Sequence, residues 1–209
     1  MYKTSILLLL LTTFTLGAQD DPKKDALLLY RQGDFKAAIE VCKTEITARP
    51  DNMDSYTVLG WSLLRLKDYA QAIKFAEEAL AKNKFDWRIN EIAGEANYYL
   101  GKSKEALKYF EQYAVLAPTG DRIELVYYFM GEIYLQLGDY NRADIALTTA
   151  IYHAPSTAKW WERLGFARLQ AKDYKNSKTA YDEALRLNPN SPEAQRGRKQ
   201  AEEKLATPN

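Results

Sequence analysis

The sequence predicts an all-α solenoid in which helical hairpins stack side by side into a superhelix. The main observation is a fixed period, because 34 residues separate Gly60 from Gly94 and again Gly131 from Gly165. A repeat of this length is typical of a stacked array and not of a closed globule. A second observation is composition, since 46% hydrophobic and 27% charged residues suit a soluble protein with a substantial core.

The period predicts the domain organisation of the whole chain. The expected units are a signal peptide (1–18), a degenerate first repeat (19–52), four full repeats (53–86, 87–120, 124–157 and 158–191) and a C-terminal capping helix (192–206).

The first residues have the form of a secretory signal peptide. Lys3 precedes the apolar run Ile6–Leu11, and the small residues Gly17 and Ala18 end the segment. The run is shorter than the roughly 20 residues that a membrane-spanning helix needs. We expect cleavage after Ala18 and a periplasmic or secreted protein. The alternative is a retained N-terminal anchor, which would be the protein's only contact with a membrane.

Each repeat is expected to hold two packed helices. A glycine inside a helix costs about 1 kcal/mol relative to alanine, so Gly60 and its equivalents predict a close approach of the two helices. The small residues Ala72, Ala106 and Ala143 are expected to face these glycines. Aspartate precedes an aromatic residue at the start of three of the second helices, where it can act as the N-cap. These aromatic residues are Tyr69, Tyr140 and Tyr174.

These blocks resemble the tetratricopeptide repeat (TPR) family, a helix–turn–helix unit of about 34 residues. The block that matches best contains Tyr127, Met130-Gly131, Tyr134, Gly138, Tyr140, Ala143, Leu147, Ala150 and Pro155. The resemblance implies a right-handed superhelix that binds protein or peptide partners along its concave face. The C-terminal end of the array also fits a helical solenoid, because Ser191 can act as the N-cap of a helix that begins at Pro192.

One irregularity interrupts the period. Gly94 and Gly131 are 37 residues apart, so three extra residues lie between the third and fourth blocks. The turn-forming residues Thr119, Gly120 and Asp121 place the insertion there. Either it is a longer loop or an extra turn on the next helix, or it changes the superhelical pitch and shapes a binding site.

The sequence shows no catalytic, metal or cofactor site. His153 is the only histidine and Cys42 the only cysteine, and a zinc site needs about four ligands. We expect an exposed histidine and a buried, unreactive cysteine. The net charge of +1 and the scattered basic residues do not favour nucleic acid. We therefore expect no enzyme activity, no cofactor and no small-molecule substrate.

The TPR resemblance places ligand contacts on the first helix of each repeat. The expected groove residues are Trp61, Arg65, Arg88, Glu91, Glu95, Tyr98, Tyr128, Glu132, Glu162 and Phe166. Aromatic anchors with acidic neighbours predict a peptide that carries apolar side chains and Lys or Arg. Alternatively, the aromatic residues only seal neighbouring repeats and the acids are ordinary solvated charges.

Three functions remain open at this point. The first is a scaffold or adaptor that binds its partner in the concave groove, in a bacterial envelope assembly. The second is a structural subunit that packs edge-on into a larger complex and leaves the groove empty. The third is an enzyme or small-molecule carrier, for which the sequence offers no candidate cluster of polar residues.

Overall fold

The computed structural model describes residues 25–207, and within this range it contains helices and no strand. The predicted signal peptide, residues 1–18, and the first six residues of the predicted first repeat lie outside the described part of the chain. The helices are α1 (Ala26–Gln32), α2 (Phe35–Ala48), α3 (Met53–Arg65), α4 (Tyr69–Lys82), α5 (Trp87–Tyr99), α6 (Ser103–Leu116), α7 (Ile123–Gln136), α8 (Tyr140–His153), α9 (Ala158–Gln170), α10 (Tyr174–Leu187) and α11 (Pro192–Ala206).

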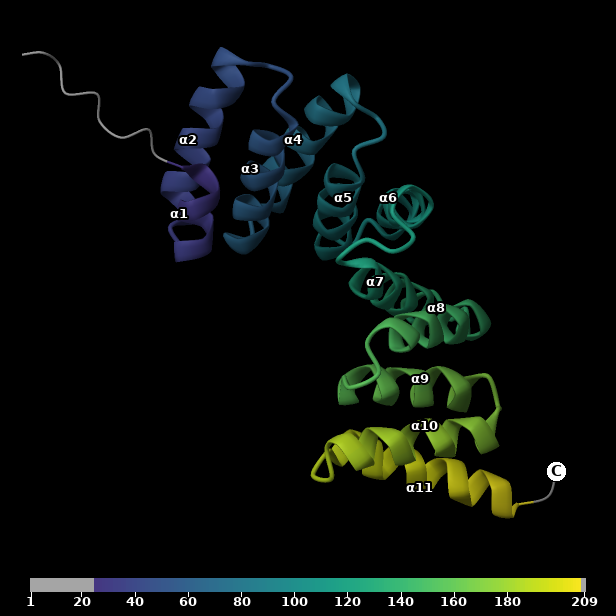
Figure 1. Ribbon diagram of the computed structural model, residues 1–209. Helices are drawn as coiled ribbons and strands as arrows, with labels where there is room; N and C mark the ends of the chain where they lie inside the picture. The colour runs from purple at the N-terminus through teal and green to yellow at the C-terminus, as the bar shows by residue number, and fades with distance from the viewer. Residues whose placement is uncertain (1–24, 208–209) are drawn as a thin grey trace, which may run out of the picture.

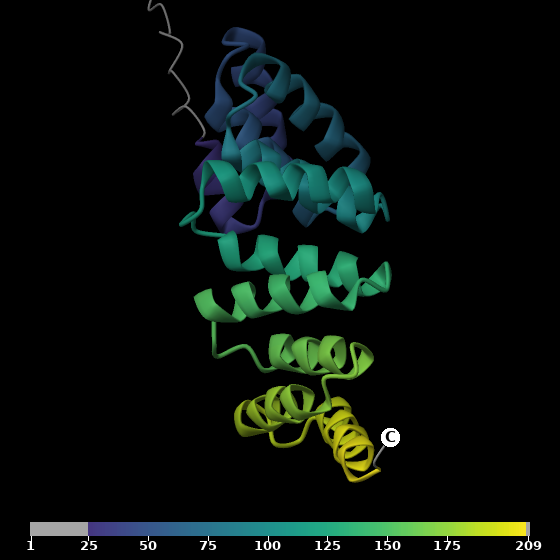
Figure 2. The same cartoon turned by 90° about the vertical axis from the view of Figure 1, so that its right-hand side faces the viewer.

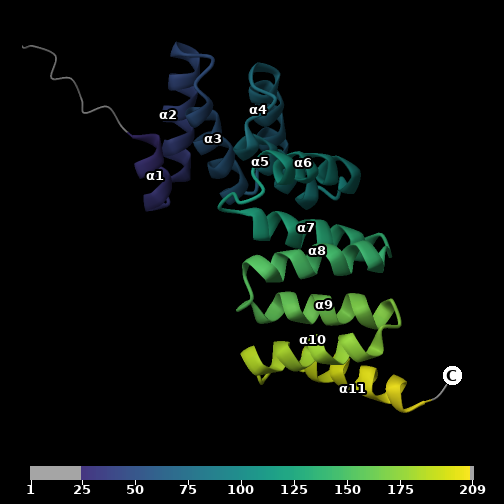
Figure 3. The same ribbon diagram turned by 45° about the vertical axis from the view of Figure 1, so that its right-hand side comes forward.

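Consecutive helices form hairpins that stack into a curved array (Figure 1). Helices α3, α5 and α7 lie on the inside of the bend, whereas α4, α6 and α8 lie on the outside. The direction of the helices changes along the array, so that α7 to α11 run across the axis of α1 to α3 (Figures 2 and 3). The all-α superhelical fold predicted from the period is therefore confirmed. None of the described helices is long and apolar enough to span a membrane.

The predicted caps are present at the starts of the helices. Asp68, Asp139 and Asp173 each accept a hydrogen bond from the backbone N–H three residues ahead. Ser191 accepts from the N–H of Ala194, and Pro192 occupies the first helical position of α11. Such caps satisfy N–H groups that have no partner inside the helix and contribute about 1 kcal/mol each.

The glycines do permit close packing, but the residues that face them differ from the prediction. A Cβ atom added to Gly94 would lie 2.6 Å from the Phe110 ring, and one added to Gly131 would lie 2.6 Å from Leu147 Cγ. At Gly60 the neighbour is Ile92, on the first helix of the next hairpin. The atoms nearest to each missing Cβ belong to these larger side chains and not to Ala72, Ala106 or Ala143, which are themselves fully buried in the second helices. Large side chains fill the space that each missing Cβ leaves.

The insertion lies where the turn-forming residues predicted it. The linker between α6 and α7 spans residues 117–122, whereas the linkers before α3, α5, α9 and α11 span 49–52, 83–86, 154–157 and 188–191. Helix α7 is also one residue longer than α3, α5 and α9. The three extra residues are thus divided between the loop and the helix.

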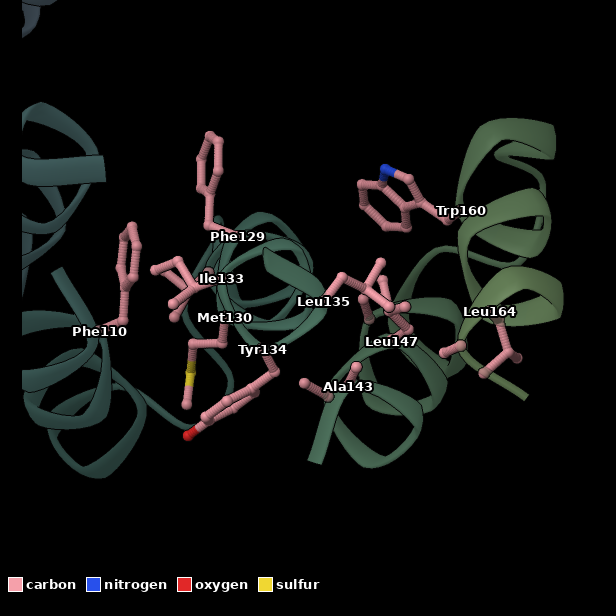
Figure 4. Packing of buried hydrophobic residues seen from close by; sticks show 14 of the residues in the cluster. Phe110, Phe129, Met130, Ile133, Tyr134, Leu135, Ala143, Leu147, Trp160 and Leu164 are labelled. Atoms are coloured by element: carbon pink, nitrogen blue, oxygen red, sulfur yellow. The ribbon is translucent and has the colours of Figure 1, made fainter. Parts of the chain in front are cut away.

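The buried core follows the array and separates near the insertion. One cluster extends from Ala26 to Ala96, and a second extends from Ala106 to Ala180. In the second cluster Phe110 stacks on Phe129 of α7, with ring centroids 5.6 Å apart, and Leu147 packs between α7 and α9 (Figure 4). The boundary between these two clusters lies between α5 and α6 of the third hairpin, and a smaller third cluster holds Tyr181, Ala184 and Ala194 near the C-terminal end.

Candidate functional site

The predicted groove residues all lie on the first helices of the hairpins. Helix α3 holds Trp61 and Arg65, α7 holds Tyr128 and Glu132, and α9 holds Glu162 and Phe166. The other four lie on α5. We call the surface formed by these ten residues and their neighbours on α3, α5, α7 and α9 the inner face. The residues on α5 are Arg88, Glu91, Glu95 and Tyr98.

Two glutamates of the inner face share one arginine. The Arg122 guanidinium donates from Nε to Glu91 Oε1 and from Nη2 to Glu95 Oε2, each over 2.8 Å. Arg122 belongs to the inserted linker, and its own N–H donates to the hydroxyl of Tyr113. Glu91 is only 2% exposed, and this burial raises the pKa of its carboxyl group, although Arg122 opposes the shift. The linker is therefore held against α5 by a largely buried ion-pair cluster.

The other acids of the inner face are also paired within the chain. Arg163 donates to Glu132 over 2.6 Å, from α9 to α7. Glu162 accepts from the Ser191 hydroxyl and pairs with Lys159 at 2.9 Å. The Arg163 contact connects α9 to α7, and the Ser191 contact connects α9 to the start of α11, whereas the Lys159 pair lies within α9. The first two stabilise the stacking of the array, and all three satisfy the carboxylates.

The burial of two glutamates contradicts the alternative that the acids of the groove are ordinary solvated charges. Glu91 and Glu162 are 2% and 6% exposed, so neither is a solvated charge on the surface. Arg88 bridges Asp86 and Asp54 at 2.8 and 2.7 Å. The guanidinium of Arg65 lies over the Phe35 ring, 5.3 Å from its centroid. Most charged groups of the predicted groove thus already have partners within the protein.

Aromatic rings form a continuous row that begins at Tyr69 of α4 and runs across the inner face. Tyr69 stacks on Tyr99 with centroids 4.8 Å apart, and Tyr99 contacts Tyr98 at 5.3 Å. Tyr98 packs on Phe129 of α7 at 4.8 Å. Farther along, Tyr128 stacks on Trp160 of α9 at 5.3 Å. The rings join successive hairpins, as the sealing alternative requires, yet Tyr99 remains 49% exposed.

Three hydroxyl groups of this row have no hydrogen-bond partner among the described residues. They belong to Tyr98, Tyr99 and Tyr128, and burial raises the pKa of each. For Tyr128 the value is about 12, with Glu132 adding to the effect of burial. The phenols therefore remain protonated at neutral pH and can donate hydrogen bonds to a ligand.

Open space lies at both ends of the inner face. At the N-terminal end a cavity of about 470 Å³ lies between α1, α2, α3 and α5. Its lining combines apolar residues such as Val58 and Trp61 with charged ones, namely Asp25, Glu45, Arg49, Asp54 and Arg88. The Nε1 atom of Trp61 is buried and has no hydrogen-bond partner among the described residues. At the other end a cavity of about 290 Å³ lies beside Phe166 and Glu162. Both volumes are near the range of ligand pockets.

Cys42 and His153, the two residues considered as a reactive thiol and a metal ligand, lie where the sequence predicted them, one buried and the other exposed. Cys42 is fully buried, and burial raises the pKa of its thiol to about 12, so the reactive thiolate is suppressed. His153 is exposed at the end of α8 beside Tyr152. Over residues 25–207 no group of three or more His, Cys, Asp or Glu side chains is placed to hold a metal ion.

Several residues of the inner face were not predicted from the sequence. Arg122, Arg163, Phe129 and Trp160 all contact predicted groove residues. One regularity in the sequence corresponds to these two ion pairs, because each arginine lies 31 residues after the glutamate that it contacts: Arg122 after Glu91, and Arg163 after Glu132. Because that spacing is three residues short of the repeat period, comparison of equivalent repeat positions does not reveal it.

The family models agree with the repeated hairpins. Models described as tetratricopeptide repeat match residues 25–86, 57–121, 125–157 and 158–191. The chain belongs to the tetratricopeptide repeat family. The resemblance inferred from the repeated residues is thereby confirmed, and protein interaction is the general role of this fold.

Individual TPR proteins are related at a distance. BBSome complex member BBS4 of Bos taurus is 25% identical over 195 residues, which cover 77% of this chain and 37% of the relative. The chain thus spans little more than a third of that protein's length. The structure of MamA residues 41 to the end from Desulfovibrio magneticus RS-1 has a TM-score of 0.70 at 19% identity, covering 80% of this chain and 93% of MamA.

A third related structure is that of a peptide-binding TPR protein. YrrB, described as a TPR protein with an unusual peptide-binding site, has a TM-score of 0.70 at 17% identity and covers 83% of this chain and 88% of its own. At these identities the MamA and YrrB structures show a common fold only.

Proposed function

We propose that the protein is a non-enzymatic scaffold or adaptor that holds a protein or peptide partner on its inner face. The observation that carries this proposal is the row of aromatic rings with three unpartnered tyrosine hydroxyls, flanked by a cavity at each end. Aromatic side chains with a polar tip supply contact area at low entropic cost and are enriched at interfaces. YrrB, with its peptide-binding site, offers a precedent within the same fold.

The location is a further part of the proposal. The N-terminal sequence pattern around Lys3, Ile6–Leu11 and Ala18 supports export through a cleaved signal peptide. We infer that the scaffold acts in a bacterial envelope assembly. Expression of the full chain, followed by N-terminal sequencing of the exported product, tests this part. A mature protein that begins at Gln19 is expected, and full-length protein retained in the cytoplasm would contradict it.

A second candidate function has its own observation. On the outer side, Ile145 and Tyr152 of α8 are 68% and 82% exposed, and Val115 of α6 is 75% exposed. BBS4, a distant relative, is named as a member of a complex. A structural subunit that packs through this outer surface would need these side chains and leave the inner face empty.

A matched pair of variants distinguishes the two candidates. Tyr98→Ala changes the inner face and Tyr152→Ala the outer face, with the same residue type in both. The measurement is the amount of each copurifying protein, by quantitative mass spectrometry, with circular dichroism to check folding. The scaffold proposal expects the partner to be lost from Tyr98→Ala alone. Loss from Tyr152→Ala alone would instead support the structural subunit.

A further inference from the structure

The hydrogen-bonding state of the inner face limits the chemistry of its ligand. The charged groups at its centre are already paired, since Glu91 and Glu95 share Arg122 and Glu132 holds Arg163. A Lys- or Arg-rich ligand would have to compete with these arginines for the carboxylates. The basic peptide suggested by the sequence is therefore disfavoured by the contacts that the structure contains.

Four neutral donors of the inner face lack hydrogen-bond partners among the described residues. Three are the hydroxyls of the partly or well exposed Tyr98, Tyr99 and Tyr128, and the fourth is the buried indole N–H of Trp61 beside the N-terminal cavity. A buried donor without a partner destabilises the protein, so a ligand that brings an acceptor to Trp61 after a small side-chain shift would recover that energy. The ligand should thus present uncharged acceptors, of which backbone carbonyls are the most abundant.

The need for free backbone carbonyls also limits the conformation of the ligand. An α-helix uses its own carbonyls internally and leaves only the last four without partners. A β-strand needs a neighbouring backbone edge, and the inner face is built from helices whose backbone groups are already paired. A polyproline II segment has no internal hydrogen bonds, so all its carbonyls are available. Its proline rings also pack well in aromatic-lined surfaces.

We propose that the inner face binds an extended, weakly charged and proline-rich peptide segment of a partner protein, and that it recognises the backbone carbonyls of this segment. The rings of Tyr98, Tyr99 and Tyr128, which are partly or well exposed, contact its proline rings, and their hydroxyls donate to its carbonyls. This inference rests on the proposed scaffold function and names the chemical class of its ligand.

The test is selection from a random dodecapeptide display library on the full-length protein. The control is the triple variant Tyr98→Phe, Tyr99→Phe and Tyr128→Phe, which keeps the rings and removes only the hydroxyls. We expect peptides rich in proline and poor in Lys and Arg. Because one hydrogen bond contributes about 1 kcal/mol, roughly a fivefold change, the triple variant should bind the selected peptides at least about tenfold more weakly. Equal melting temperatures establish that the variant is folded.

The other outcomes are equally informative. Selection of Lys- or Arg-rich or helix-forming peptides, or equal binding by the triple variant, would overturn the inference and leave the scaffold function standing. The dissociation constant should also change little between about 0.05 and about 0.5 M salt, because screening weakens charged contacts and leaves neutral ones. No enrichment on either protein would overturn both the inference and the proposed use of the inner face.

Discussion

Replacement of Arg122 by methionine should destabilise the array in a manner that depends on pH. The substitution keeps much of the side-chain volume and leaves Glu91, which is 2% exposed, without its cation. Removing one partner of a buried ion pair costs about 3–5 kcal/mol. The Arg122 side chain is 36% exposed, so we expect the low end, about 3 kcal/mol at pH 8.

The sign of the pH dependence follows from burial. Glu91 has a raised pKa in the folded protein, and loss of Arg122 raises it further. Above the unfolded-state pKa of about 4.3, the folded state then binds more protons than the unfolded state. The free energy of unfolding therefore falls as pH rises toward the folded-state pKa, by at most about 1.4 kcal/mol per pH unit. The destabilisation by Arg122→Met should be much smaller at pH 5 than at pH 8.

The assay is urea unfolding followed by circular dichroism at pH 5 and pH 8. Adding Glu91→Gln to Arg122→Met should restore much of the stability at pH 8, because a neutral amide replaces the unpaired carboxylate. The control is Arg186→Met, which removes an exposed pair with Glu183 and should cost less than about 1 kcal/mol at both pH values. An equal loss at pH 5 and pH 8, or a double variant no more stable than Arg122→Met, would refute the reasoning.

Two further predictions concern packing and capping. Gly131→Ala should lower the melting temperature in thermal denaturation, because the new Cβ would lie 2.6 Å from Leu147 Cγ. Overpacking of this kind costs about 1–3 kcal/mol, which exceeds the roughly 1 kcal/mol that alanine gains over glycine in helix propensity. A higher melting temperature would show that Leu147 moves aside at little cost. Ser191→Ala removes the N-cap of α11 and a partner of Glu162, so it should cost about 1–2 kcal/mol and speed amide hydrogen exchange in α11. Ser156→Ala, at an exposed linker position, is the matched control, and equal exchange in the two variants would contradict the assigned cap.

The sequence predicted the parts of the fold that depend on local chemistry and on the period. Asp68, Asp139, Asp173 and Ser191 cap helices as expected, since a cap depends on residues only two or three positions away. The insertion was placed correctly because Thr119, Gly120 and Asp121 are turn formers. The family assignment required only the order and spacing of the repeated residues.

Contacts between repeats were harder to predict. The neighbour of Gly94 is Phe110 and that of Gly60 is Ile92, because the packing geometry and the side-chain volumes decide which residue enters the space. The pairing of Glu91 and Glu95 with Arg122 depends on the path of the longer linker, which the period does not describe. Hence the aromatic character of the inner face was predicted, whereas its internal charge neutralisation was not. The signal peptide and the ligand remain predictions.

The central claim is that the inner face holds the partner, and site-specific photo-crosslinking in the native host tests it most directly. A photoreactive residue is placed at Tyr98 or Tyr128 on the inner face, and at Lys108, an exposed residue of the outer helix α6, as the control. Mass spectrometry then identifies the adducts and the crosslinked segment. We expect adducts from the two inner positions alone, in an extended segment of one partner. Adducts from Lys108 alone, or none at any position, would contradict the claim.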